Sequence, residues 1–201
     1  GIFWMYNDAW GEVGWTIIDY FLRRKAGFYG VKRALAHQKL TMRNVNGELI
    51  IQGNNDTPCT KKFDAEFGYV SFDGSERKTR TLSIELAPRT RSYILKEKMP
   101  EFDSKKGSIV LIPEDKDLDP VMLFVLENRF LDYTSTPVQV SSRQQDTSTV
   151  LTISSPVYAH GVYIEGIYNC SDNYFDILPG EEKTIVVENP NADSLTVKQI
   201  R

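Results

Sequence analysis

The sequence contains few of the residues from which metal sites and disulfide frameworks are built. Only two cysteines and two histidines occur among 201 residues. Cys59 and Cys170 lie far apart in the sequence, and neither has the neighbouring Cys or His that a zinc site requires. We expect two separate thiols, because nothing else in the sequence indicates a disulfide framework. No metal and no cofactor is therefore predicted.

Two common catalytic signatures are also missing. No Gly-x-Ser-x-Gly elbow accompanies His37 or His160, and no glycine-rich loop could cradle a phosphate. The absence of these two motifs disfavours a serine hydrolase and a nucleotide-binding enzyme. Both histidines are interpreted as polar, partly exposed side chains.

Long apolar runs and an excess of positive charge are absent as well. Lys and Arg number 24 against 27 Asp and Glu, which gives a net charge of −3 and no basic stripe, so no nucleic-acid partner is expected. No apolar run approaches the length of a membrane span, and the first residues lack the basic region of a signal peptide, so no membrane partner is expected. A hydrophobic content of 41% is enough for a sizeable core and disfavours global disorder.

What the sequence does have is a concentration of indole at one end. All three tryptophans, Trp4, Trp10 and Trp15, lie in the opening stretch GIFWMYNDAWGEVGW, interleaved with polar residues such as Asn7 and Asp8. A sugar-binding cleft needs both kinds of side chain, because a pyranose has an apolar face that stacks on an aromatic ring and a rim of hydroxyls. The chain also begins inside an apolar run and without an initiator Met, which indicates a cut within a longer polypeptide.

A single βα unit is predicted at this end of the chain. Residues 2–6 form a continuous apolar run, which is typical of a strand buried on both faces. Residues 25–36 are predicted to form an amphipathic helix whose apolar face consists of Phe28, Val31 and Leu35.

From residue 38 onward the pattern changes to short β-strands. Asn46-Gly47 is a hairpin signal, and roughly seven strand candidates are separated by Gly, Pro, Asp or Asn as far as residue 132. After the linker LDYTSTP, further short candidates continue to the C-terminus. We predict a mainly β chain with two tandem Ig-like antiparallel β-sandwiches, at residues 38–132 and 133–201.

One stretch near the C-terminus, SDNYFDILPGEEKTIVV, is patterned in detail. Asp172-Asn173 suits a turn that hydrogen-bonds its own backbone, and Phe175 and Ile177 share one strand face. Pro179-Gly180 fits the centre of a type II turn. This pattern predicts a corner of the second sandwich and needs no function to explain it.

Three carboxylates of the N-terminal segment are candidate catalytic groups. A retaining glycosidase needs two carboxylates about 5–5.5 Å apart, and the segment offers Asp8, Glu12 and Asp19. Acidic residues in a loop are usually solvated or capping, so no residue of the chain is assigned a catalytic role.

Two segments carry a resemblance to a known family. FWMYNDAWGEVGWTIIDYFLRRKAGFYGVKRAL resembles the eighth strand and helix of the catalytic (β/α)8 barrel in the β-mannosidases of glycoside hydrolase family 2. The matching residues are Trp4, Asn7, Asp8, Trp10, Trp15, Asp19, Tyr20, Lys32 and Arg33. SPVYAHGVYIE and SDNYFDILPGEEKTI are similar to the Ig-like domain that closes the same enzymes.

The resemblance implies that the chain is the C-terminal region of a retaining exo-β-mannosidase acting on terminal β-D-mannose residues. Residues 1–37 would be the last strand and helix of the barrel, and the partners would be a β-mannoside oligosaccharide and the missing barrel. The family's two catalytic glutamates precede this region, so the chain alone is expected to be inactive. In a bacterial parent the resemblance is compatible with a periplasmic or secreted location.

The same resemblance assigns four substrate-binding residues. Trp4 matches the aromatic residue on the floor of the sugar pocket, at the face where such barrels place their sites. Asn7, Asp8 and Trp10 match the loop that lines the rim. Two alternatives stay open: an exo-β-glucosaminidase or other family 2 glycosidase, and a non-enzymatic Ig-like carbohydrate-binding or adhesion module. The first has Asn where this chain has Asp8, and the βα unit argues against the second.

Packing of the N-terminal segment can also be predicted. Only a few residues separate the helix from Lys39, so we expect it to dock on the first sandwich, with Lys32 and Arg33 on its opposite face. Trp4 and Trp10 should then be left exposed or be covered by a second copy of the chain in a homodimer.

Overall fold

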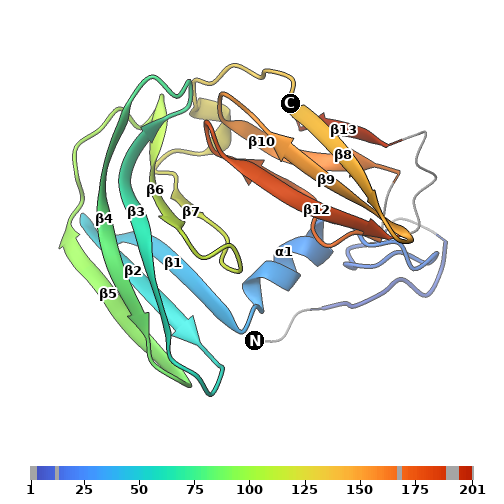
Figure 1. Ribbon diagram of the computed structural model, residues 1–201, viewed down its shortest axis with the longest axis horizontal. Coiled ribbons are helices and arrows are strands. Elements are labelled where there is room, and N and C mark those ends of the chain that lie inside the picture. Colours follow the sequence, from blue (N-terminus) through green and yellow to red (C-terminus); the bar gives the residue numbers. More distant parts are fainter. Residues whose placement is uncertain (1–3, 12–13, 167–168, 189–194, 201) are drawn as a thin grey trace. The chain divides into compact units, whose positions relative to one another are not determined.

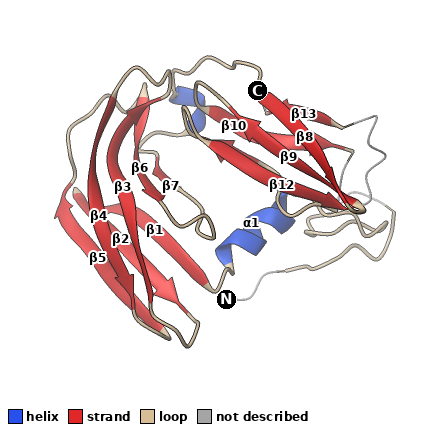
Figure 2. Ribbon diagram, in the orientation of Figure 1, coloured by secondary structure: helices blue, strands red, loops and turns tan. Residues whose placement is uncertain are grey.

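The chain forms two compact units that are each described by themselves. The computed structural model describes residues 4–11, 14–166, 169–188 and 195–200. One unit combines Gly1–Leu35 with Thr134–Arg201, and the other is Ala36–Tyr133 (Figure 1). Strands account for most of the regular structure in both (Figure 2). Among the described residues, no helix has the length and apolar character needed to cross a membrane.

The Ala36–Tyr133 unit is built from two antiparallel sheets. One sheet has the strand order β1-β2-β5 and the other β4-β3-β6-β7. Its elements are β1 (Gln38–Val45), β2 (Glu48–Asn55), β3 (Lys61–Ser71), β4 (Arg77–Leu86), β5 (Thr90–Lys98), β6 (Gly107–Pro113), β7 (Val121–Leu123) and the 3-10 helix η1 (Asn128–Phe130). Side chains from both sheets, including Leu49, Ile51 and Leu111, are fully buried in one shared core.

Local sequence signals account for the hairpin that begins this unit. Asn46 and Gly47 connect β1 to β2, and both have positive φ, at 52° and 83°. Two-residue hairpin turns of this kind need the left-handed region at both positions, which Asn and Gly adopt at the lowest cost. The predicted hairpin is therefore present.

The second unit contains the other sandwich. Its two antiparallel sheets have the orders β12-β9-β8 and β11-β10-β13. The strands are β8 (Gln139–Gln145), β9 (Ser148–Ser154), β10 (Ala159–Glu165), β11 (Phe175–Ile177), β12 (Glu182–Glu188) and β13 (Thr196–Gln199). Phe175 and Ile177 share one face of β11 as predicted, and both are buried in the core. Gly180 has the positive φ that the predicted turn requires. The predicted fold class, mainly β with Ig-like antiparallel sandwiches, is confirmed.

The helix α1 (Ala26–Ala34) packs on this second sandwich. Tyr29 is fully buried in the core cluster that also contains Leu151 and Ile185. The prediction that the helix docks on the sandwich at residues 38–132 is therefore wrong. A short connection in sequence brings two segments near each other but supplies no packing energy, whereas burial of Tyr29 does.

The predicted apolar face of the helix also needs correction. Leu35 lies just after α1 and is 64% exposed, and Phe28 and Val31 are only partly buried. Tyr29 carries the packing instead. The helical period alone could not distinguish these alternatives, because the segment has apolar or aromatic residues on more than one side.

The strand predicted over residues 2–6 falls partly outside the described residues. Residues 4–6 are described and contain no strand. Asn7 forms an isolated parallel bridge with Ile18, and Ile18 forms an antiparallel bridge with Arg24. The chain therefore folds back on itself where the prediction has a strand.

Candidate functional site

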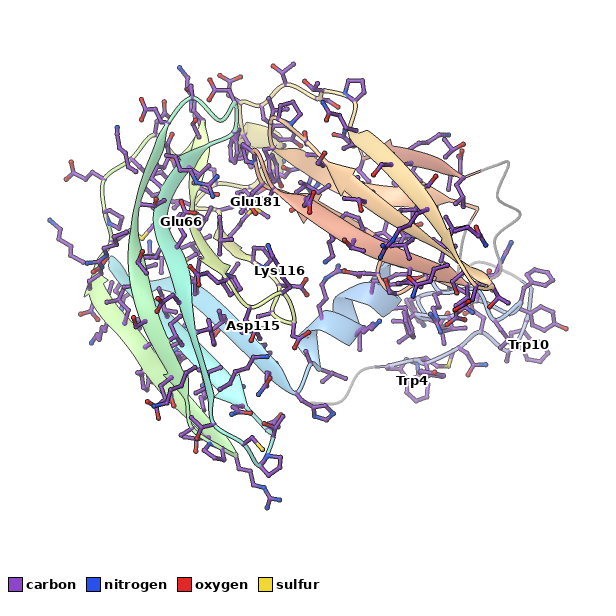
Figure 3. All side chains as sticks on the ribbon, in the orientation of Figure 1. Trp4, Trp10, Glu66, Asp115, Lys116 and Glu181 are labelled. Carbon is purple, nitrogen blue, oxygen red and sulfur yellow. The ribbon has the colours of Figure 1, made fainter. Side chains whose placement is uncertain are left out.

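The N-terminal segment before α1 presents aromatic side chains to solvent. We call residues 4–18 the tryptophan loop, of which residues 12 and 13 lie outside the described part. Trp4, Trp10 and Trp15 are 79%, 71% and 83% exposed. Figure 3 shows Trp4 and Trp10 projecting from the ribbon of this segment. Such exposure is unusual for indole and makes this surface a candidate binding site.

Backbone hydrogen bonds close the base of the tryptophan loop. The amide of Asp8 donates to the carbonyl of Ile18 over 3.0 Å, and the amide of Ile18 donates to the carbonyl of Tyr6 over 3.0 Å. The amide of Lys25 donates to the carbonyl of Ile17 over 2.9 Å. The two ends of the loop are thereby joined to each other and to the start of α1.

Asp8 does not face solvent. Its side chain is 7% exposed, and its Oδ2 accepts a hydrogen bond from Lys25 Nζ over 2.7 Å. The hydrogen bond from Lys25, with a second from Thr16, lowers the pKa of Asp8 below its ordinary value, although burial opposes the shift. The carboxylate is therefore ionised at neutral pH and already paired.

A cavity lies beside the base of the loop. It has a volume of about 380 Å³. Its lining consists of Tyr6, Asn7, Ile18, Leu22, Arg24 and Phe28. Of the four residues predicted to bind substrate, Asn7 alone belongs to this lining, while Trp4 and Trp10 are exposed elsewhere on the segment. The structure thus brings Asn7 to a cavity but does not gather the four residues around one.

Asp19, the other described carboxylate of the N-terminal segment, is bound within its own turn. Asp19 accepts hydrogen bonds at Oδ1 from the amides of Phe21 and Arg23, each over 2.9 Å, and at Oδ2 from Arg23 Nε over 2.6 Å. Burial alone would raise the pKa of Asp19, but the hydrogen bonds from Arg23 lower it. Asp19 therefore caps a turn, and Glu12 lies outside the described residues.

Basic residues of the helix region make contacts that sequence reasoning missed. They bind residues 170–174, which we call the anchor segment, at its backbone carbonyls. Lys32 Nζ donates to Ser171 O over 2.5 Å, and Arg24 Nη1 donates to Cys170 O over 3.4 Å. Arg33 Nη2 donates to Tyr174 O over 2.9 Å.

An ion-paired carboxylate completes this contact. Arg33 Nη1 donates to Asp172 Oδ1 over 2.5 Å, and Lys183 Nζ lies 2.6 Å from Asp172 Oδ2. Tyr29 OH lies 3.3 Å from Cys170 Sγ. Tyr29, Lys32 and Arg33 lie in one of the two stretches that resemble the family, and the SDNY run lies in the other. This was the one signal in the sequence that pointed to the contact.

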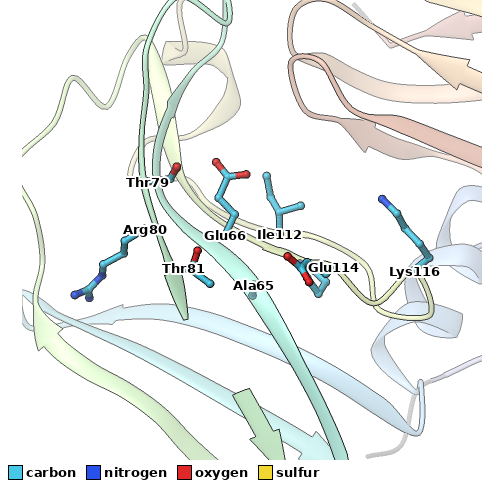
Figure 4. Close-up of a pocket in the computed structure, with 9 residues that line it drawn as sticks. Ala65, Glu66, Thr79, Arg80, Thr81, Ile112, Glu114 and Lys116 are labelled. Atoms are coloured by element: carbon cyan, nitrogen blue, oxygen red, sulfur yellow. The ribbon is translucent and has the colours of Figure 1, made fainter. Parts of the chain in front are cut away.

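A second cavity lies in the Ala36–Tyr133 unit. It has a volume of about 410 Å³ and lies over β3, β4 and the end of β6 (Figure 4). Its lining consists of Ala65, Glu66, Thr79, Arg80, Thr81, Ile112, Pro113, Glu114 and Lys116. That lining has no aromatic side chain on which a sugar could stack, and Glu66 is bound to Arg77 over 2.6 Å. Sequence analysis did not predict this cavity.

The fold and these surfaces define a class of protein before any comparison. It is a mainly β protein with two antiparallel Ig-like sandwiches, of which one holds a helix and an aromatic loop. A family model described as the Ig-fold domain of mannosidases matches residues 134–201. That region is therefore a mannosidase-type Ig-like domain.

Individual relatives extend the match to nearly the whole chain. Beta-mannosidase B of Aspergillus terreus is 24% identical over 98% of this chain, and the Aspergillus niger enzyme is 25% identical over 96%. Each match covers 26% of the relative. The chain thus spans about a quarter of the length of the curated relatives that it matches.

Solved structures are also similar to this chain over nearly its whole length. The β-D-mannosidase of Dictyoglomus thermophilum superposes with a TM-score of 0.88 at 25% identity, over 98% of this chain and 25% of that protein. An exo-chitosanase of Amycolatopsis orientalis shares the fold, with a TM-score of 0.63 at 16% identity over 98% of this chain and 29% of that protein. The predicted relationship to the β-mannosidases of glycoside hydrolase family 2 is confirmed.

Proposed function

We propose that this chain is the C-terminal region of a retaining exo-β-mannosidase, in which the tryptophan loop forms one wall of the sugar site. The observation that carries the proposal is the exposure of Trp4, Trp10 and Trp15 on a loop whose base is closed by hydrogen bonds. The similarity to β-mannosidases over 98% of the chain supports it.

Three of the predicted residues have the exposure that direct contact with a sugar requires. Trp4 and Trp10 offer ring faces for stacking on a pyranose, and Asn7 offers a donor and an acceptor for its hydroxyls. Asp8 differs from them, because its carboxylate is buried and bound to Lys25. We propose that Asp8 contributes to the rim by fixing the backbone of Asn7 and its neighbours.

The division of the chain follows from the same proposal. Residues 1–37 would be the last strand and helix of the (β/α)8 barrel, residues 38–132 an Ig-like sandwich and residues 133–201 the closing Ig-like domain. The packing of α1 on the closing domain supports a role for that domain in holding the last helix of the barrel in place.

The chain by itself is proposed to be inactive. A retaining glycosidase needs an acid/base and a nucleophile, and the resemblance assigns both glutamates to the part of the enzyme that precedes this region. Two carboxylates of the N-terminal segment are occupied in other ways, since Asp8 pairs with Lys25 and Asp19 caps a turn.

An exo-β-glucosaminidase is the second candidate. The fold shared with an exo-chitosanase favours it, but that similarity is at only 16% identity and concerns the fold alone. The β-mannosidases match more closely in both sequence and structure.

Hydrolysis of two chromogenic glycosides decides between these functions. A polypeptide that joins this chain to a family 2 barrel should hydrolyse 4-nitrophenyl β-D-mannoside, with little action on 4-nitrophenyl β-D-glucosaminide. The 201-residue chain alone should hydrolyse neither. Preference for the glucosaminide would select the second candidate, and turnover by the chain alone that Asp8→Asn abolishes would refute the assignment of catalysis to the barrel.

A further inference from the structure

Lys25 uses its whole hydrogen-bonding capacity within one loop. Its ammonium nitrogen donates to Asp8 Oδ2 over 2.7 Å, to Thr16 Oγ1 over 2.8 Å and to Gly14 O over 2.9 Å. A lysine ammonium has three donors, so all three are satisfied. The three acceptors come from both arms of the tryptophan loop, and one cation therefore ties the arms together.

Lys25 also lies at the start of α1, so it joins the loop to the helix. It is the N-cap residue of α1, and α1 is fixed to the sandwich core through fully buried Tyr29. The hydrogen bonds of Lys25 therefore connect the loop that carries the exposed tryptophans to a helix that is packed on the sandwich core.

Gly14 shows how closely the loop is folded around the carboxylate. A Cβ placed on Gly14 would lie 2.2 Å from Asp8 Oδ1, which is far inside van der Waals contact. The loop backbone must therefore pass directly beside the Asp8 carboxylate. This arrangement leaves Asp8 little room to turn outward toward a ligand.

We propose that Lys25 is a positioning residue of the sugar site, which holds the tryptophan loop in its binding conformation through Asp8, Gly14 and Thr16. This proposal rests on the proposed function for its consequence in catalysis, but the clamp itself is a property of the 201-residue chain. Asp8 then acts on substrate only through the loop.

Hydrogen exchange tests the clamp without any assay of activity. The amides of Asp8 and Ile18 close the base of the loop and serve as reporters. Lys25→Met, which keeps the aliphatic stem and removes the donors, should accelerate exchange at both amides at least tenfold. Asp8→Asn, which keeps an acceptor but loses the charge, should accelerate it less.

A matched control is available on the same unit. Lys198 on β13 makes an ion pair with Glu165 on β10 over 2.6 Å, and both side chains are about half exposed. Lys198→Met should leave exchange at Asp8 and Ile18 unchanged. Exchange across α1 should be unaltered in all variants, which shows that the unit is still folded. Unchanged exchange at Asp8 and Ile18 in Lys25→Met would overturn the clamp.

Kinetics test the consequence for the sugar site. In the polypeptide joined to its barrel, Lys25→Met should lower kcat/KM on 4-nitrophenyl β-D-mannoside at least tenfold, mainly through KM, because the loop must be ordered on binding. Trp10→Ala serves as the comparison. If Trp10→Ala lowers kcat/KM and Lys25→Met does not, the positioning role is overturned while the proposed function stands. If neither variant has an effect, the proposed function itself fails.

Discussion

Two basic side chains of the N-terminal segment, Lys25 and Arg33, bind protein groups that a helical wheel does not reveal. Lys25 donates to three acceptors in the tryptophan loop, and Arg33 donates to Asp172 Oδ1, Asn173 O and Tyr174 O. Charged donors of this kind are stronger than neutral ones and fix geometry as well. At the scale of single residues, these cations organise the segment.

Tyr29 should contribute more to stability than any other residue of α1. It is fully buried in the core cluster, so Tyr29→Ala should cost about 3–5 kcal/mol in the free energy of unfolding. Tyr29→Phe should cost about 1 kcal/mol, because it keeps the buried ring and removes the hydroxyl that contacts Cys170 Sγ. Urea unfolding followed by circular dichroism measures both. Tyr93→Ala, at an exposed position, is the control, and an equal loss there would contradict the assignment.

A histidine–carboxylate pair in the closing domain should make stability depend on pH. Asp176 Oδ1 lies 3.1 Å from His160 Nδ1 and accepts from the amide of Gly161 over 2.7 Å. The hydrogen bond with Asp176 raises the pKa of His160 above its ordinary value of 6.5, although burial opposes this. Burial alone would raise the pKa of Asp176, but the hydrogen bonds from His160 and Gly161 lower it below 3.8.

The sign of the effect follows from these directions. The His160 contribution is fully present below pH 6.5 and is lost as the pH rises through the higher pKa of the folded state. The Asp176 contribution is present above pH 3.8 and is lost as the pH falls through the lower folded pKa. The stability difference between the unsubstituted chain and His160→Gln should thus be largest near pH 5.5 and shrink toward pH 8.5. A difference that stays constant with pH for His160→Gln would be contrary to the prediction.

At the scale of elements, α1 and the anchor segment hold each other in place. Residues 170–174 precede β11, and their carbonyls accept from Arg24, Lys32 and Arg33. Asn173 binds the segment to β10, since its Oδ1 accepts from the amide of Ile164 over 2.9 Å. An irregular segment whose carbonyls point to a helix is a suitable partner for basic residues on that helix.

Removal of Arg33 should loosen α1 selectively. Arg33→Met loses three hydrogen bonds, but Asp172 keeps Lys183 as a partner, so we expect a cost of about 2 kcal/mol. Opening of α1 should become roughly 30-fold more frequent, which amide exchange across Ala26–Ala34 measures. Arg129→Met, which removes a surface pair with Glu127, is the control. Equal exchange in the two variants would mean that the anchor does not hold the helix.

The elements that were predicted correctly are those whose conformation depends on residues close together in the sequence. The Asn46-Gly47 hairpin and the Pro179-Gly180 turn depend on backbone preferences of the residues themselves, and both are present. The docking of α1 was predicted wrongly, because its partners are carbonyls of residues 170–174, whose positions depend on the whole second sandwich.

The candidate site was predictable only in part for the same reason. The exposure of Trp4 and Trp10 was one of two predicted outcomes, because the resemblance implies that the rest of the barrel is missing. The pairing of Asp8 with Lys25 depends instead on how the loop folds back, and composition carries no information about that.

At the scale of the whole molecule, the two ends of the sequence belong to one compact unit. The N-terminal segment and Thr134–Arg201 pack together, while Ala36–Tyr133 forms a unit of its own. The two stretches that resemble the family, one at each end of the sequence, therefore contact each other through α1 and the anchor segment. Their joint role in the proposal is to present the tryptophan loop to a sugar.

The kinetics of Trp4→Ala in the polypeptide joined to its barrel test that central claim most directly. Trp4 is 79% exposed, so its removal should leave folding nearly unaffected. Loss of an aromatic stacking surface should cost about 2–4 kcal/mol, or roughly 30- to 1,000-fold in kcat/KM on 4-nitrophenyl β-D-mannoside. Tyr93→Ala, which removes an exposed ring from β5, should leave kcat/KM unchanged. An unchanged kcat/KM in Trp4→Ala would contradict the account, because the exposed indole would then not be part of the sugar site.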